Sequence, residues 1–149
     1  MKPLYKFSFR NNNAANKTTN IHVNGELVKD VFIDYLGVTA VTLLFQGSTI
    51  TSAKIAEGYT HADSGPFEQC QQIQLIDFPS TIQSIGWIRY MAANVKLIVR
   101  AVTPPSTRQI LGIYGNIYVP DESVEAYKGT TGWSEYASRI KGLSDYVES

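Results

Sequence analysis

The side chains that most often carry chemistry are few in this chain and lie far apart. Cys70 is the single cysteine, and His22 and His61 are the two histidines. A cysteine nucleophile needs a base within hydrogen-bond reach, and no His-Asp arrangement accompanies Cys70 in the sequence. Because free cysteine is among the most buried residue types, we expect Cys70 to be a buried structural side chain.

The histidines also lack the spacing of a metal site. His22 lies in an expected strand, and His61 lies close to Asp63 in an expected loop. A bound metal needs three or four convergent ligands, and one His-Asp pair supplies too few. The sequence therefore predicts no metal site.

Two further motifs have simpler structural explanations. The glycines of residues 112–115 (Gly-Ile-Tyr-Gly) follow no strand-to-helix pattern, so a turn is expected there rather than a phosphate-binding loop. Asp121 and Glu122 follow Pro120 at an expected helix start, where negative charge complements the helix dipole and Asp121 suits the N-cap. We therefore expect no catalytic, cofactor-binding or metal-binding residue, no cofactor, and a protein that is not an enzyme.

Composition narrows the class of protein further. The chain has 149 residues, of which 44% are hydrophobic, which suits one domain with a sizeable core. Its 13 basic and 13 acidic side chains cancel, so no net field draws it to nucleic acid or to an anionic membrane. No window approaches the ~18–20 apolar residues that span a bilayer, and the N-terminus lacks the apolar run of a signal peptide. We expect neither nucleic-acid binding nor membrane insertion.

The N-terminal part has its own β signals. Residues 4–10 alternate in polarity like a half-buried strand, and residues 11–17 form a polar loop. Asn24-Gly25 stands between two short apolar segments and favours a tight hairpin turn. These features predict a small antiparallel β unit over residues 1–37, which we interpret as a docking arm.

An internal repeat follows. Residues 41–52 and 73–84 are offset by 32 positions and agree at five of twelve positions. The apolar strand recurs at 95–99 and at 117–119, with offsets of 22. Short strands every 20-odd residues, separated by turn residues, are typical of a leucine-rich-repeat-like stack. The longer first offset predicts a loop inserted at 56–66, a stretch rich in Gly and small polar residues.

The C-terminal part predicts a cap on this stack. Pro120 ends the last apolar strand, and a helix is expected over 122–128 with Gly129 ending it. A second helix is expected over 133–141, because Trp133, Tyr136, Ala137 and Ile140 fall at helical spacing. The last layer of a stack needs such a cover for its apolar face, so we assign residues 121–142 to a helical cap.

Three segments resemble the C-terminal repeats of BspA-like leucine-rich-repeat proteins, a family common on Bacteroidetes surfaces. Residues 67–73 (Phe-Glu-Gln-Cys-Gln-Gln-Ile) are similar to the family's Ala-Phe-x-x-Cys-x-x-Leu element. Residues 78–86 (Phe-Pro-Ser-Thr-Ile-Gln-Ser-Ile-Gly) resemble its Ile-Pro-Ser-Ser-Val-Thr-Ser-Ile-Gly element. Residues 100–105 and 117–133 resemble the exit and cap of its arrays. The resemblance covers roughly residues 41–145.

Together these observations predict a mainly β fold: an N-terminal β-hairpin or sheet unit (1–37), then a short irregular leucine-rich-repeat solenoid with a helical cap (38–149). We expect a non-enzymatic structural or attachment module that binds other protein subunits within a larger assembly. The resemblance and the start at Met1 with a short β arm favour a virion component of a bacteriophage of Bacteroidetes: a capsid decoration, head-fibre or tail protein. The alternative is a bacterial cell-surface adhesin that binds a host protein or glycan.

The sequence does not decide whether one group of apolar side chains is exposed or buried. Trp87, Tyr90 and Met91 are either an exposed contact patch or part of the core, and their spacing fits both. Partner, binding face and oligomeric state are equally open at this stage.

Overall fold

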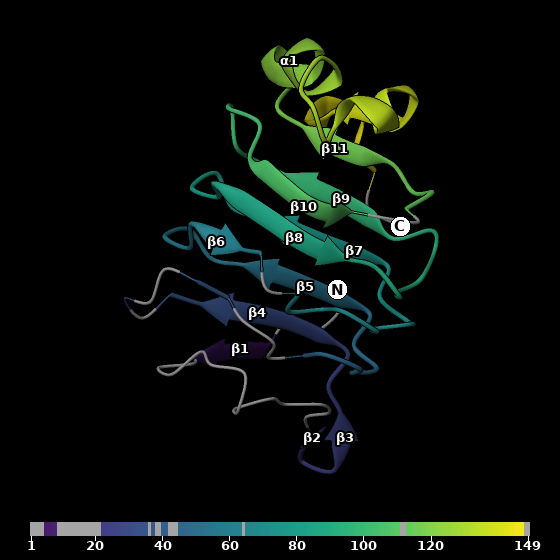
Figure 1. Ribbon diagram of the computed structural model, residues 1–149. Helices are drawn as coiled ribbons and strands as arrows, with labels where there is room; N and C mark the ends of the chain where they lie inside the picture. The colour runs from purple at the N-terminus through teal and green to yellow at the C-terminus, as the bar shows by residue number, and fades with distance from the viewer. Residues whose placement is uncertain are drawn as a thin grey trace.

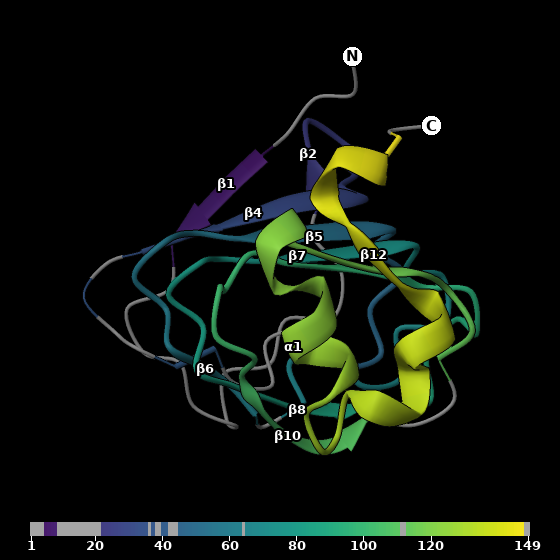
Figure 2. The ribbon, with the colours of Figure 1, turned by 90° about the horizontal axis from the view of Figure 1, so that it is seen from above.

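Two parallel sheets face each other and a small cap lies over one end of both (Figures 1 and 2). The structure is a computed structural model that describes residues 5–8, 22–35, 37, 40–41, 45–63, 65–110 and 113–147. The predicted mainly β fold with a small helical part is confirmed.

The larger sheet has seven strands, and every neighbouring pair in it is parallel. Its order follows the sequence from one edge to the other. The strands are β1 (Tyr5–Ser8), β4 (Asp30–Asp34), β5 (Ser52–Ile55), β7 (Leu75–Phe78), β9 (Lys96–Val99), β11 (Ile117–Val119) and β12 (Ile140–Gly142).

In the described part of the chain the smaller sheet has three parallel strands, in the order β10-β8-β6. From β5 to β11 the chain passes alternately between the two sheets, so each circuit adds one strand to each sheet. The strands of the smaller sheet are β6 (His61–Ala62), β8 (Ser84–Ile88) and β10 (Ser106–Ile110).

The register of the strands corrects the predicted repeat. Ser52 pairs with Leu75, 23 residues later, and Leu75 pairs with Lys96, 21 residues later. The offset of 32 is therefore wrong, and the loop predicted at 56–66 is wrong too, because that stretch contains β6. The predicted strands near 73–78, 95–99 and 117–119 are confirmed as β7, β9 and β11. Residues 42–44 of the first predicted copy lie outside the described residues.

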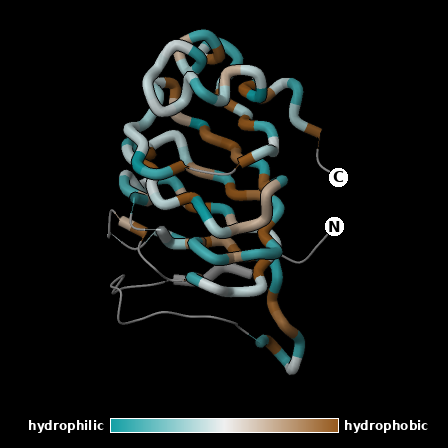
Figure 3. The backbone as a smooth tube through the Cα atoms, turned by 45° about the vertical axis from the view of Figure 1, so that its right-hand side comes forward, coloured by the Kyte–Doolittle hydropathy of each residue, from teal (hydrophilic) through white to brown (hydrophobic). Residues whose placement is uncertain are grey.

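One inward-facing row holds the larger sheet to the core. Its members lie side by side on six neighbouring strands, and all are 0–2% exposed. Full burial of such a side chain contributes roughly 1.5–3 kcal/mol, and the apolar stretches recur from layer to layer (Figure 3). The row consists of Val31, Ala53, Ile76, Leu97, Ile117 and Ile140.

The N-terminal part is only partly as predicted. The hairpin at Asn24-Gly25 is confirmed: β2 (His22–Val23) and β3 (Glu26–Leu27) are antiparallel, and Asn24 and Gly25 both have positive φ. The strand β1 instead pairs with β4 in parallel, so the prediction of an antiparallel unit is wrong. A parallel pair needs a crossover of a dozen or more residues, and the segment that contains the hairpin is long enough to provide it.

The predicted division at residue 37 stays a prediction, but hydrogen bonds of the larger sheet cross it. β4 lies before that position and pairs with β5 after it. Val31 and Ile33 of β4 are fully buried in the common core. Removal of residues 1–35 would therefore expose apolar core as well as remove the predicted docking arm.

Both helices predicted for the cap differ from the elements that the structure has there. The first predicted helix is a 3-10 turn, η2 (Asp121–Ser123), followed by α1 (Val124–Lys128), and Gly129 ends it as expected. The second predicted helix is a 3-10 segment, η3 (Ser134–Arg139), which gives way to β12. A last turn, η4 (Leu143–Asp145), follows β12. Ile140 fits a helical stripe by spacing, but its pairing with Ile117 takes it into the larger sheet.

Each layer supplies hydrogen-bond donors to carbonyl groups of the layer before it. In the interior, the Tyr59 hydroxyl donates to the Asp34 carbonyl at 2.7 Å, 25 residues earlier. The cap does the same for the last layer, because a parallel stack ends in carbonyls that have no further strand to satisfy them. The cap donors are Ser123 to Val102, Tyr127 to Ala101, Trp133 to Pro105, Tyr136 to Ile110 and Arg139 to Ile113.

Tyr127 tests this role of the cap. Its ring is fully buried against Trp133, and its hydroxyl donates to the Ala101 carbonyl at 2.5 Å. Tyr127→Phe leaves that carbonyl buried without its donor, so we expect a loss of about 1–3 kcal/mol in the free energy of unfolding. Chemical denaturation measures it, with Tyr114→Phe as control, since Tyr114 is 72% exposed. Equal stabilities of the two variants would contradict this role.

Candidate functional site

The most distinctive surface lies where the chain turns from the smaller sheet back to the larger one. Residues from the ends of β8 and β10 and from the segments after them lie together there, with Arg139 of the cap beside them. We call this the arginine–aromatic surface. It consists of Trp87, Arg89, Tyr90, Gln109, Tyr114 and Arg139.

Arg89 is the centre of this surface. Its guanidinium carbon lies 4.3 Å from the ring centroid of Trp87 and 5.0 Å from that of Tyr90. Its Nε lies 2.8 Å from Glu68 Oε1, and its Nη1 lies 3.5 Å from the side-chain oxygen of Gln109. The side chains of three successive layers thus hold Arg89 in one position.

Backbone conformation explains why Trp87 and Tyr90 lie where they do. Both have positive φ, 55° and 57°, and Gln109 has φ 57°. Side chains other than glycine rarely adopt this region, and each such residue costs roughly 1–3 kcal/mol. Gly65 occupies the position 22 residues before Trp87 and has φ 78°, so the fold itself requires positive φ there. Trp87, Tyr90 and Gln109 thus adopt a backbone conformation that glycine would adopt at a lower energetic cost.

The structure answers the question that the sequence left open. Tyr90 is 62% exposed, whereas Trp87 is half-buried and Met91 packs against the hydrophobic core. Trp87 and Met91 also border a small apolar space inside the fold, with Phe67 and Phe78. The patch therefore has one exposed ring, one ring shared between surface and core, and one core side chain.

A second arginine repeats this arrangement one level closer to the cap. The Arg139 guanidinium carbon lies 5.1 Å from the Tyr136 ring centroid and 5.5 Å from that of Tyr114. The Tyr114 backbone N–H donates to the Ala93 carbonyl at 2.7 Å, which ties the two turns together. Tyr114 is the most exposed aromatic ring of the surface.

Neutral polar side chains extend the surface toward the N-terminal layers. These residues belong to the turn that follows β6, where Glu68 already neutralises Arg89. The surface therefore offers aromatic rings and amides around an Arg89 whose charge is neutralised. The exposed amides are Gln69, Gln71, Gln72 and Gln74.

This arrangement suits binding rather than proton transfer. Tryptophan, tyrosine and arginine are the residue types that dominate binding energy at protein interfaces. Side chains that are already fixed lose less entropy when a partner binds. Cation–π contacts of this kind contribute roughly 0.5–2 kcal/mol each, which helps to keep Arg89 and Arg139 in place.

Cys70 is buried, as expected from the sequence. Its side chain is fully enclosed, and its thiol donates to the Phe45 carbonyl at 2.9 Å. Burial raises the pKa of the Cys70 thiol to about 11, so the thiol stays protonated at neutral pH. A protonated, enclosed thiol is inert as a nucleophile.

The other candidate residues do not gather around Cys70. His22 and His61 are exposed on β2 and β6, and the Nδ1 of His61 lies 2.7 Å from the Thr60 hydroxyl. Asp63 is exposed and accepts a hydrogen bond from the Ser84 hydroxyl at 3.1 Å. Within the described ranges no three His, Cys, Asp or Glu side chains are grouped as metal ligands would be.

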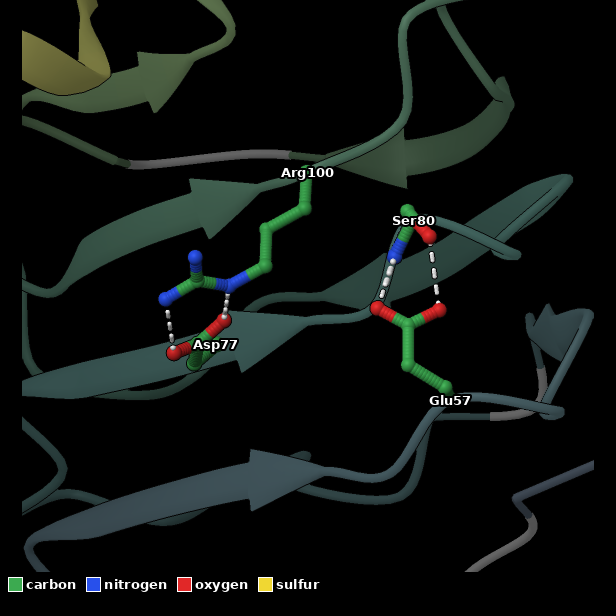
Figure 4. Close-up of polar contacts among 4 residues, drawn as sticks. All are labelled: Glu57, Asp77, Ser80 and Arg100. Atoms are coloured by element: carbon green, nitrogen blue, oxygen red, sulfur yellow. Dashed lines mark hydrogen bonds and ion pairs between the residues drawn. The ribbon is translucent and has the colours of Figure 1, made fainter.

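Two carboxylates lie toward the carboxyl ends of strands of the larger sheet, Asp77 on β7 and Glu57 just after β5 (Figure 4). Arg100 binds both oxygens of Asp77, at 2.8 and 2.9 Å, and this pairing raises the pKa of Arg100. Glu57 accepts from the Ser80 backbone N–H at 3.0 Å and from its hydroxyl at 2.6 Å. Paired carboxylates can act as acid and base, but these are occupied by contacts between layers.

Asp121 makes the same kind of contact in the cap. Its Oδ1 accepts the Ser144 backbone N–H at 3.0 Å, and this hydrogen bond lowers the pKa of Asp121. The predicted N-cap role of Asp121 is therefore wrong, since no side chain caps η2. Of the predicted glycine turn, Gly112 lies outside the described residues, and a Cβ on Gly115 would meet the Val95 carbonyl at 2.2 Å.

None of the helices in the described part of the chain has the length and apolar character of a membrane span. No protein-family model, curated protein or solved structure matches the chain.

Glu57 generates a pH-dependent prediction. Burial alone would raise its pKa, but the hydrogen bonds from Ser80 and Thr81 and the nearby Arg100 charge together lower it. A carboxyl group whose pKa is lowered by folding adds stability above its unfolded pKa, and that stability is lost as the pH falls through the folded pKa. Glu57→Gln should thus lower Tm at pH 7 by roughly 1–3 °C and not at pH 3. Thermal unfolding at both pH values measures this.

Glu26→Gln serves as the control, because Glu26 is exposed on the protruding hairpin. Its Tm should match that of the unmodified protein at both pH values. A Glu57→Gln effect that is equal at pH 7 and pH 3 would show that its charge does not stabilise the fold.

Proposed function

We propose that the chain is a non-enzymatic attachment module, built as a short irregular leucine-rich-repeat solenoid of the BspA-like type. Support comes from the register, in which equivalent residues recur every 20 to 23 positions from Asp30 to Ile140. Each circuit of the chain adds one strand to each of two parallel sheets, so every layer contacts only its neighbours. The helical part then serves as the C-terminal cap.

The arginine–aromatic surface carries the functional proposal. It combines an exposed Tyr90 with an arginine held on four sides by Trp87, Tyr90, Glu68 and Gln109. Such a pre-ordered surface suits a stable contact with another protein subunit. The protein is then a component of a bacteriophage virion: a capsid decoration, head-fibre or tail protein that works within a larger assembly.

The absence of enzymatic activity is part of the proposal. It is supported by an inert Cys70 thiol, by histidines on separate exposed strands, and by carboxylates that are occupied in contacts between layers. These side chains serve the fold, which leaves the exposed rings and amides for binding.

A second candidate is a bacterial cell-surface adhesin that binds a host protein or glycan. The exposed glutamines of the turn that follows β6 favour it, because amides and aromatic rings suit an uncharged, hydroxyl-rich ligand. Mass spectrometry of purified virions from candidate phages separates the two. The chain at a constant copy number per particle supports the virion proposal, and its absence from all particles refutes it.

Tyr90 provides the mutational prediction. Particles assembled without the chain are incubated with added protein, and the bound fraction is measured after sedimentation. Because an exposed aromatic hot spot contributes roughly 2 kcal/mol or more, Tyr90→Ala should weaken retention at least ~10-fold. The stability of the Tyr90→Ala variant should change little, because the Tyr90 ring is largely outside the core.

Val102→Ala is the matched control. Val102 is 59% exposed and lies on the turn after β9, on the carboxylate side of the fold. Its retention should equal that of the unmodified protein. Equal retention of Tyr90→Ala and Val102→Ala would exclude the arginine–aromatic surface as the attachment site.

A further inference from the structure

The cap lies over the end of the smaller sheet but adds no strand to it. In the larger sheet β11 and β12 continue beyond β9, but the smaller sheet has β10 as its last strand. The residue that would pair next with Ser106, one repeat later, falls near Lys128, which is the end of α1. The end of α1 thus falls at the sequence position where a further strand of the smaller sheet would be expected.

The hydrogen-bond phase of β10 shows which groups face that open edge. The Ser106 amide donates to the Gln83 carbonyl of the neighbouring layer at 2.9 Å. In a parallel ladder alternate residues bond to the same neighbour, so the Thr107 backbone points the other way. Within the described part of the chain, the Thr107 N–H and C=O have no hydrogen-bond partner.

The cap binds carbonyls on either side of Thr107 and touches its side chain, but its described residues make no hydrogen bond with the Thr107 backbone. Trp133 Nε1 donates to the Pro105 carbonyl at 2.8 Å, and the Tyr136 hydroxyl donates to the Ile110 carbonyl. Between these two contacts lies a groove of about 830 Å³ that is open to solvent. It is bordered on one side by β10 and on the other by Thr130, Thr131, Gly132 and Glu135 of the cap.

The shape of the groove limits its occupant. Gly132 lies directly over the Thr107 side chain, since a Cβ on Gly132 would meet Thr107 Oγ1 at 2.0 Å. Only small side chains of an occupant fit beside that contact. Among the described residues that line the groove, Glu135 alone is charged, and it favours a basic side chain at its end.

We propose that the β10 edge binds an extended peptide segment of a partner protein by strand addition. A peptide backbone carries one acceptor and one donor that match the Thr107 N–H and C=O, and sheet edges bind peptides in this way. The segment lies along β10 and its backbone pairs with Thr107. It carries small residues toward Gly132 and a Lys or Arg toward Glu135. This site is separate from the arginine–aromatic surface and does not depend on it.

A displayed library of random linear peptides, selected against the intact protein, tests the site. Selected peptides should bind Thr107→Pro at least ~10-fold more weakly, because proline removes the free N–H. Proline is tolerated where a strand N–H is not part of a ladder, so the variant should keep its fold. Hydrogen exchange should show a fast Thr107 amide in the free protein that slows when a selected peptide binds, while the Ser106 amide is slow throughout.

A second pair of variants guards against a folding defect at position 107. Thr131→Trp fills the groove from the cap side without a change in β10, and it should also abolish peptide binding. Ser138→Trp places the same side chain on an exposed cap position outside the groove and should leave binding intact. Circular dichroism and thermal unfolding check that all three variants are folded.

Three results would overturn the proposal. The library could return no binder, or its binders could bind Thr107→Pro and Thr131→Trp as well as the unmodified protein. Light scattering could also reveal a self-associated form that Thr107→Pro abolishes, in which case the occupant is a second copy. If Tyr90→Ala loses particle retention but still binds the selected peptides, the β10 site is independent of the arginine–aromatic surface.

Discussion

Hydrogen bonds from each layer to the carbonyls of the layer before it are the constraint on which this fold depends. A strand of the larger sheet is satisfied along its length by its neighbours, but the turns between the sheets expose carbonyls inside the protein. Tyr59 and Cys70 satisfy two of them, at Asp34 and Phe45. The cap continues this pattern with Tyr127, Trp133 and Tyr136, so its aromatic residues serve both as apolar cover and as donors.

Sequence patterns predict the strands that carry long apolar runs. β7, β9 and β11 are such strands, and the Asn24-Gly25 hairpin follows from turn chemistry. β6 consists of His61 and Ala62 only, so its place in the smaller sheet is decided by the layers on each side of it. Without β6, the repeat between 41 and 73 takes a false offset. Neighbouring layers, not local propensity, determine the shortest strands.

The arginine–aromatic surface was predictable in its residue types but not in its orientation. Trp87 and Met91 have the apolar character of core residues, and Tyr90 differs from them only slightly. Positive φ at Trp87 and Tyr90 turns one ring partly inward and the other outward, and no local pattern in these residues signals it. The fully buried Cys70 was predictable, because its type and its isolation from any base both favour the interior. The contacts of Arg89 could not be predicted from the sequence, because they join side chains from three stacked layers.

The uniform register has a consequence for how such a chain can change its size. Ile76, Leu97 and Ile117 occupy equivalent places on successive strands, and each meets only the layer above and the layer below. An in-frame duplication or deletion of one repeat would therefore keep every interlayer contact of the same kind. The molecule would lengthen or shorten by about 4.8 Å, the spacing of neighbouring strands. The length of the molecule can thus evolve in steps of one layer while the cap and the arginine–aromatic surface are preserved.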